Sequence, residues 1–346
     1  MRNPSRTSLE LVIDGRWLSM DCLYGDVVPS WVWPGGSDTL TFQPATVPRN
    51  RFSGGELVTA MYGPVPVWAG SLAEPDPSQP MSAVGAWQEA TCQALDGSGN
   101  ATTVPDTAID AAIGRGAVSW SRVNSLSTTA VDLDVSQGPV TLGALLDEYA
   151  LANGLRWGVD ARRVVYAKVD DTIPSWQTWP LESGLGYDTT NYFSTLLGRY
   201  YNGTNYRTAI VTGDTVHGYR EAPPLDLTGR GTLTSAKASN LLTNMLKLGV
   251  ATPAFSQSIG FSYGELLSPG GVPVDLEVAG AAIDGALLRV HGGWDLVQRK
   301  NAQLYLDVLL GRASLQDGVL TVQAMQSSTK NLADFVAKAS TRKVLQ

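Results

Sequence analysis

Chemically reactive side chains are scarce in this sequence. Its 346 residues include only two cysteines and two histidines. Cys22 and Cys92 lie far apart, and neither has the CxxC or Cys/His spacing of a structural zinc site. His217 and His291 also lack acidic or thiol neighbours at ligand spacing. We therefore expect no metal and no cofactor, and we favour two reduced thiols over a disulfide, which stays open as an alternative.

Catalytic signatures are missing as well. The sequence contains no GxSxG, HExxH or P-loop motif. Glycoside hydrolysis needs two facing carboxylates, but the adjacent Asp170 and Asp171 would point to opposite faces of a strand. Asp132 and Asp134 share a face and could in principle bind Ca²⁺, although a solvated strand edge is the simpler interpretation. These absences predict that the chain is not an enzyme.

Long apolar runs and charged residues are also in short supply. No stretch approaches the roughly 18 apolar residues of a membrane span, and the basic N-terminus lacks a signal-peptide core. We therefore expect no membrane anchor and synthesis in a host cytoplasm. Charged residues make up 16% of the chain, against about 25% in ordinary proteins. Either burial in an assembly or a β-rich fold with Ser, Thr and Gly on its surface would explain this. The net charge of −7 disfavours a wrapped nucleic-acid partner.

Short alternating strands dominate the first part of the chain. "SLELVIDGRWLSMDCL" turns at Asp14-Gly15, and "GDVVPSWVWPGGSDTLTFQP" breaks at residues 34–36. "GELVTAMYG" and "VPVWAGSLAEPDP" follow, before a proline-rich exit at residues 76–80. Turns every 8–12 residues are typical of a small barrel or sandwich. We expect one barrel over residues 1–80.

Helical periodicity appears in residues 81–185. "VPDTAIDAAIGR" predicts a helix with Asp106 as its N-cap. The clearest helix is predicted over 141–152, where Thr141 can cap the start and Asn153-Gly154 ends it. "AWQEATCQALDGSG" is predicted to form a strand and a turn, and "LRWGVDARRVVYAKVD" a hairpin. We expect an α+β domain here.

Strands return in residues 186–346, where we expect a second β-barrel. It should contain a helix at 235–249 and a short C-terminal helix in "TKNLADFVAKAS". "PVDLEV" is predicted to be one of its strands. The expected fold class is therefore mainly β, with two barrel domains flanking a helix-containing α+β domain.

Tryptophan, by contrast, is plentiful, with ten residues. Trp31 and Trp33 alternate on one strand face, Trp68 lies in a hairpin, and Trp176 and Trp179 flank a proline-bounded loop. Such residues fill the cores of small barrels or anchor protein partners, and on loops they can also stack against sugars.

The order of these segments resembles the phage baseplate hub proteins, often called minor tail proteins in siphophages. Two segments of the first barrel carry the resemblance, "GDVVPSWVWPGGSDTLTFQP" and "VPVWAGSLAEPDP". Residues 104–120 and 141–180 of the helical region and the segment "PLDLTGRGTLTSAKASNLLTNML" also carry it. The resemblance implies that both barrels are related to tail-tube subunits. It also implies a homotrimer, whose six barrels form a pseudo-hexameric ring at the tail tip of the virion.

The resemblance also implies a set of partners. A distal tail protein or the tail tube would lie above the ring, and a spike or fibre protein below it. The C-terminus of the tape measure protein would occupy the lumen, and DNA would pass through only transiently. Many siphophage hubs continue into fibre-bearing extensions, so here we expect a separate protein to contact the host. The candidate assembly-interface residues are Trp31, Trp33, Trp68, Trp176 and Trp179.

Two alternative functions remain. A distal tail protein would form a hexameric adaptor, and a tail-tip lectin would bind host glycans through tryptophan-rich loops. The strong helices at 141–152 and 235–249 favour the hub over the distal tail protein.

Overall fold

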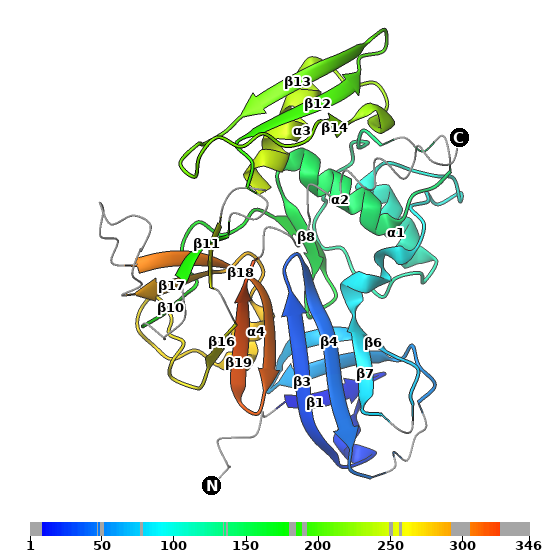
Figure 1. Cartoon of the computed structure of the whole chain (residues 1–346). Coiled ribbons are helices and arrows are strands. Elements are labelled where there is room, and N and C mark those ends of the chain that lie inside the picture. The colour runs from blue at the N-terminus through cyan, green and yellow to red at the C-terminus, as the bar shows by residue number, and fades with distance from the viewer. Residues whose placement is uncertain are drawn as a thin grey trace.

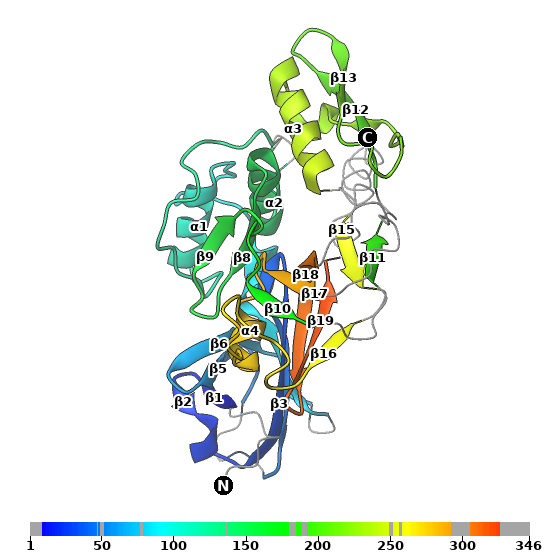
Figure 2. The ribbon, with the colours of Figure 1, turned by 90° about the vertical axis from the view of Figure 1, so that its left-hand side faces the viewer.

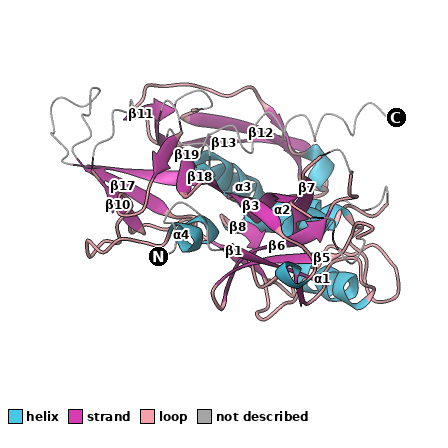
Figure 3. Ribbon diagram, turned by 90° about the horizontal axis from the view of Figure 1, so that it is seen from below, coloured by secondary structure: helices cyan, strands magenta, loops and turns pink. Residues whose placement is uncertain are grey.

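The computed structural model describes most of the chain in eleven stretches: residues 9–46, 48, 52–76, 79–133, 135, 138–179, 185–188, 192–248, 252–255, 258–291 and 305–325. Over the described chain as a whole, strands outnumber helices (Figures 1 and 3). The expectation of a mainly β fold is therefore confirmed. The predicted C-terminal helix lies outside the described residues.

The N-terminal strands form one antiparallel block. Its members are β1 (Leu9–Ile13), β2 (Arg16–Trp17), β3 (Tyr24–Val32), β4 (Gly35–Pro44), β5 (Leu57–Tyr62), β6 (Val65–Leu72) and β7 (Met81–Gly85). Within the sheet they follow the order β3-β4-β7-β6-β5-β1-β2. In β1 and β7, buried residues alternate strictly with more exposed ones, as expected of a strand that covers a core with one face.

A second block near the C-terminus repeats this arrangement. It contains β10 (Trp176–Thr178), β16 (Ile259–Phe261), β17 (Leu287–His291), β18 (Tyr305–Gln316) and β19 (Val319–Ala324). Its neighbours run β16-β19-β18-β17-β10, which resembles the run β4-β7-β6-β5-β1 of the first block. One difference is that β10 pairs with β17 in parallel, whereas β1 pairs with β5 antiparallel.

The two blocks join into one sheet because β18 pairs with β3, with Ala313 opposite Trp31. Figure 1 shows this contact, where the red β18–β19 hairpin stands beside the blue β3 and β4. Ten of the 14 strands lie on one path from β10 to β2, the other four, β8, β9, β16 and β19, branch from it, and this pairing does not show that either block closes into a barrel. One hydrophobic core spans both blocks, and its large members include Phe42, Trp68 and Phe261.

The middle of the chain contains both helices and strands. It contains η2 (Ala86–Thr91), α1 (Pro105–Gly114), α2 (Leu142–Asn153), β8 (Arg156–Val159) and β9 (Val165–Lys168). The Thr141 hydroxyl accepts a hydrogen bond from the Ala144 N–H at 3.2 Å, and Gly154 ends α2 in the left-handed conformation with φ 65°. Both helix signals in the sequence are thus confirmed.

Residues 192–248 form a small unit of their own above α2 (Figure 2). β12 (Thr195–Tyr201) lies between β13 (Tyr206–Thr212) and β14 (Leu225–Asp226), and η3 (Thr228–Arg230) precedes α3 (Ser235–Leu248). This unit has a separate core that includes Leu196, Leu233 and Leu242. Residues 186–346 therefore do not share one core. β11 (Leu185–Asp188) and β15 (Thr252–Phe255) pair as a two-stranded ribbon.

Three local predictions were wrong. Asp106 does not cap α1, because Pro105 occupies the first turn and the Asp106 carboxylate accepts the Leu126 N–H at 2.9 Å. The segment 86–91 is a 3-10 helix rather than a strand. "PVDLEV" contributes to α4 (Leu276–Ala281), whose buried Leu276 and Ala279 face the core. In a segment of six residues, the spacing of apolar residues in a helix cannot be distinguished from their alternation in a strand.

Candidate functional site

Four of the five candidate tryptophans lie inside the chain's own core. Trp31, Trp33, Trp68 and Trp176 are at most 5% exposed, whereas Trp179 is 56% exposed. A contact between any of the five and another protein stays a prediction. Of these five tryptophans, only Trp179 has a large accessible surface in the folded chain.

Trp31 and Trp68 link the two hairpins of the first block reciprocally. The Trp31 indole N–H donates to the Val67 carbonyl at 2.8 Å, and the Trp68 indole N–H donates to the Ser30 carbonyl at 3.1 Å. Because each ring is buried and each N–H is satisfied, these side chains fix how β3 crosses β6. The tryptophan in "VPVWAGSLAEPDP" therefore packs one hairpin against the other.

Trp33 forms a junction between the first block and the α+β domain. Its ring lies parallel to that of Tyr166, with 6.2 Å between the ring centroids, and its N–H donates to Asp170 Oδ1 at 2.8 Å. Arg156 also donates to Asp170, at 3.0 Å, and the Lys168 ammonium lies 5.7 Å from the Trp33 ring centroid. Asp170, which the sequence suggested only as a turn or strand residue, therefore holds this junction together.

A buried acidic contact extends the junction to the second block. The Tyr166 hydroxyl donates to the carboxylate of Asp284, which follows α4. Burial raises the pKa of Asp284 to about 6, although the Tyr166 hydrogen bond and the Lys168 charge act in the opposite direction. Burial and the Asp284 charge likewise raise the pKa of Tyr166. Three parts of the chain thus meet at Trp33, Tyr166 and Asp284.

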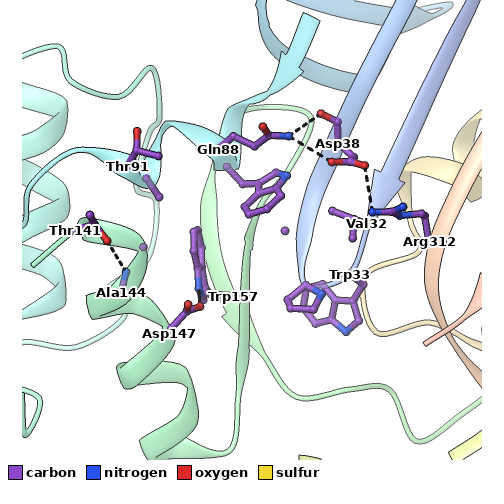
Figure 4. A pocket seen from close by; sticks show the side chains of 15 residues that line it. Val32, Trp33, Asp38, Gln88, Thr91, Thr141, Ala144, Asp147, Trp157 and Arg312 are labelled. Atoms are coloured by element: carbon purple, nitrogen blue, oxygen red, sulfur yellow. Dashed lines mark hydrogen bonds and ion pairs between the residues drawn. The ribbon is translucent and has the colours of Figure 1, made fainter. Parts of the chain in front are cut away.

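A cavity of about 670 Å³ lies beside this junction (Figure 4). Trp33 and Trp157 line it, and the Trp157 N–H donates to Asp147 at 2.8 Å. Across the cavity, the Gln88 amide donates to the Asp38 carbonyl at 3.1 Å, and Arg312 of β18 lies 3.8 Å from the Asp38 carboxylate. The ion pair between Arg312 and Asp38 therefore connects the second block to the first on this wall.

An aromatic row occupies the outer face of β10, β17 and β18. Trp179 stacks on His291 with 4.8 Å between ring centroids, and His291 lies 6.2 Å from Tyr305. Arg289 lies 3.7 Å from the Tyr305 ring centroid. The Gln177 side chain bonds His291 Nε2 at 2.9 Å and so fixes the imidazole. Its half-exposed Trp179 makes this row a candidate contact surface.

The described residues contain no group of three or more His, Cys, Asp or Glu side chains that could hold a metal ion. Asp171 lies 3.6 Å from Lys168, and Asp132 forms an ion pair with Lys237 at 2.8 Å. Both cysteines are free thiols. Within the same part of the chain, no helix has the length and apolarity to cross a membrane.

Solved structures share this architecture along almost its whole length. A 43 kDa tail protein of prophage MuSo2 from Shewanella oneidensis is 12% identical with a TM-score of 0.60, and the match covers 92% of this chain and 98% of that one. The prophage tail protein gp18 from Listeria monocytogenes EGD-e is 14% identical with a TM-score of 0.56, covering 98% and 99%. A tail protein from Neisseria meningitidis MC58 is 13% identical with a TM-score of 0.55, covering 91% and 95%.

No family model matches the sequence, and no curated protein matches it. At 12–14% identity, the three solved structures establish the fold and not the activity. They confirm the resemblance seen in the sequence: this chain has the fold of phage tail proteins.

Proposed function

We propose that this chain is a structural protein of a phage tail and acts as the homotrimeric baseplate hub at the tail tip. The observation that carries the proposal is the repeated strand order, in which two similar blocks of one chain pair with each other through β3 and β18. Three such chains would supply six similar wall units. A ring of this kind has threefold chain symmetry and near-sixfold wall symmetry.

This geometry suits an adaptor between unlike symmetries. The six wall units would face a sixfold distal tail ring or tail tube above, and the threefold lower side of the ring would face a spike or fibre. The C-terminus of the tape measure protein would occupy the lumen, and DNA would pass through after it. The domain division at 1–80, 81–185 and 186–346 belongs to this proposal, with 192–248 as a unit inserted in the last domain.

The role we propose is non-enzymatic. The acidic residues suspected from the sequence serve structural contacts, since Asp170 binds Trp33 and Arg156, and Asp132 binds Lys237. Degradation of peptidoglycan or polysaccharide by the pure chain, abolished by changing one Asp or Glu, would contradict this part of the proposal.

Counting the copies in the assembly tests the proposal. Native mass spectrometry of the purified chain should give three copies, and electron microscopy should show a ring with six wall units. Six copies per ring would instead support the hexameric distal tail protein.

The Trp179 row favours a second candidate, a tail-tip lectin. An exposed indole held rigid by His291 is a suitable platform for the apolar face of a sugar. A glycan array should show binding that is lost in Trp179→Ala. If no glycan on the array binds, this candidate is wrong.

A further inference from the structure

The seven-residue strand β13 ends its sheet without a partner on its outer edge within the described chain. Its ladder with β12 runs from Tyr201–Tyr206 to Thr195–Thr212 with no register shift, and the strand contains no proline. Proteins usually protect edge strands by shortness, bulges, proline or charge. The large sheet follows this rule, because its end strands β10 and β2 have three and two residues. β13 is protected only by Arg207.

The outward face of the β12–β13 sheet is unusually apolar for an exposed surface. α3 packs on the other face, where Ala209 and Tyr200 are buried. On the outward face, Ile210 pairs with Leu197 and is 62% exposed, and Tyr206 pairs with Tyr201 and is 61% exposed. Two large, exposed apolar side chains on one short strand make this face a candidate interaction site.

One arginine lies on the face that carries this patch, and a second lies at the open edge of β13. Arg199 on β12 lies 4.6 Å from the Tyr206 ring centroid, which holds its guanidinium over the outward face. Arg207 on β13 is exposed at the open edge, but it pairs with Tyr200 and therefore lies on the α3 face of the sheet. Aromatic rings and arginine together are the composition of energetically dominant interface residues.

The charge of this unit is opposite to that of the remaining chain. Residues 192–248 contain six Lys or Arg and three Asp or Glu, a net charge of +3, whereas the whole chain carries −7. The remainder therefore carries −10. Arg230 and Lys237 are already used inside the chain, against Glu148 and Asp132. Arg199 and Arg207 stand on the strands that carry the patch.

We propose that β13 and the outward face of the β12–β13 sheet bind a second copy of this chain. The acidic body of a neighbouring copy complements the basic unit, and one of its strands pairs with the open edge of β13. Such a contact joins two different surfaces, so it closes a ring when the rotation is threefold. The inference rests on the proposed homotrimer, since it names the surface through which the copies meet.

Two charge or polarity changes test the surface, each with a matched control. We expect Arg207→Glu and Ile210→Glu to weaken self-association by about tenfold or more in light scattering after size-exclusion chromatography. Arg162→Glu makes the same charge change at an exposed site in the α+β domain, and Val123→Glu replaces another exposed β-branched residue. Both controls should assemble like the wild type. All four variants should melt normally, because each site is exposed.

Hydrogen exchange supplies an independent readout of strand pairing. The amides of residues 206–212 should exchange more slowly in the assembled wild type than in diluted monomer, and this protection should be absent in Ile210→Glu. Normal assembly of both β13 variants would overturn the inference and leave the trimer standing. If the wild type stays monomeric, both the β13 inference and the proposed homotrimer are wrong. Protection of β13 by duplex DNA alone would assign the surface to nucleic acid and refute the proposal.

Discussion

At the scale of single residues, the contacts that hold the blocks together gather around one tryptophan. Trp33 is fully buried, its N–H reaches Asp170, and its stacked neighbour Tyr166 reaches Asp284 beyond α4. Hydrogen bonds to a carboxylate are stronger than neutral ones, and their geometry restricts how the partners can be oriented. The junction therefore fixes the α+β domain against both blocks through only a few side chains.

The raised pKa of Asp284 makes the junction sensitive to pH. Its pKa is about 6 in the folded chain against 3.8 when exposed. The folded state therefore binds the proton more tightly, and this contribution to stability falls as pH rises from about 4 to 6. An asparagine side chain cannot ionise, so Asp284→Asn should gain about 2 kcal/mol over the wild type between pH 4.5 and pH 7.5. Urea unfolding at both pH values measures this gap, and a gap independent of pH would contradict it.

At the scale of secondary-structure elements, the helices differ in how plainly the sequence marks them. α2 has a capping threonine, a C-terminal glycine and an apolar face, and the structure has all three. α4 is only six residues long and has no side-chain cap. It forms because Leu276 and Ala279 cover the core beside Trp31, which is a tertiary cause.

The apolar face of α2 should tolerate no charge. Leu145 is fully buried in the core of the α+β domain. We expect Leu145→Asp to prevent folding, because burying an unpaired carboxylate costs several kcal/mol, about the stability of a whole domain. Ala152→Asp introduces the same group on the exposed side of α2 and should cost less than about 1 kcal/mol. Calorimetry measures the thermal unfolding of both variants. A Leu145→Asp protein that melts like the wild type would refute the packing of α2 described here.

Gly280 is required by the packing of α4 on Trp31. A Cβ at this position would lie 2.3 Å from Trp31 Cζ3, and the ring is held by its bond to Val67. We expect Gly280→Ala to lower the free energy of unfolding by about 1–3 kcal/mol, despite the better helix propensity of alanine. Gly114→Ala in α1 has open space around its Cβ and should be neutral or slightly stabilising. Denaturant unfolding of both variants distinguishes a clash from a propensity effect.

At the scale of the whole molecule, one continuous sheet carries two similar blocks, and charge is divided between the parts of the chain. The chain outside residues 192–248 carries the acidic excess, and residues 192–248 carry a basic excess. In the proposed ring, the acidic part forms the wall and the basic unit meets the neighbouring copy. In such a ring, the channel would be free of the basic surface.

The channel of the assembled ring should be lined by acidic and neutral polar side chains. Double-stranded DNA carries about one negative charge per 1.7 Å of axis, so lysines and arginines along the path would bind its phosphates and slow its passage. A reconstruction of the assembled ring would show the lining directly. A channel lined mainly by Arg and Lys would refute this prediction and weaken the case for a hub.

The sequence alone determined most of the strands of the first block and the two longest helices of this protein. Alternation and turn residues predicted the strands of the first block, and capping residues with 3.6-residue periodicity predicted α2 and α3. The abundance of tryptophan pointed to packing, and four of the five candidate tryptophans are buried. These features are local, so the order of residues along the chain contains them.

Only the tertiary structure decided which strands are neighbours and which tryptophans are accessible. Alternation shows which side chains share a face, but the backbone hydrogen bonds of a ladder are the same for any sequence. The pairing of β18 with β3, the division of residues 186–346 between two cores, and the open edge of β13 were therefore not readable. Trp179 differs from Trp176 only in what surrounds it, and the meeting of Trp33, Tyr166 and Asp284 depends on three chain segments that fold together.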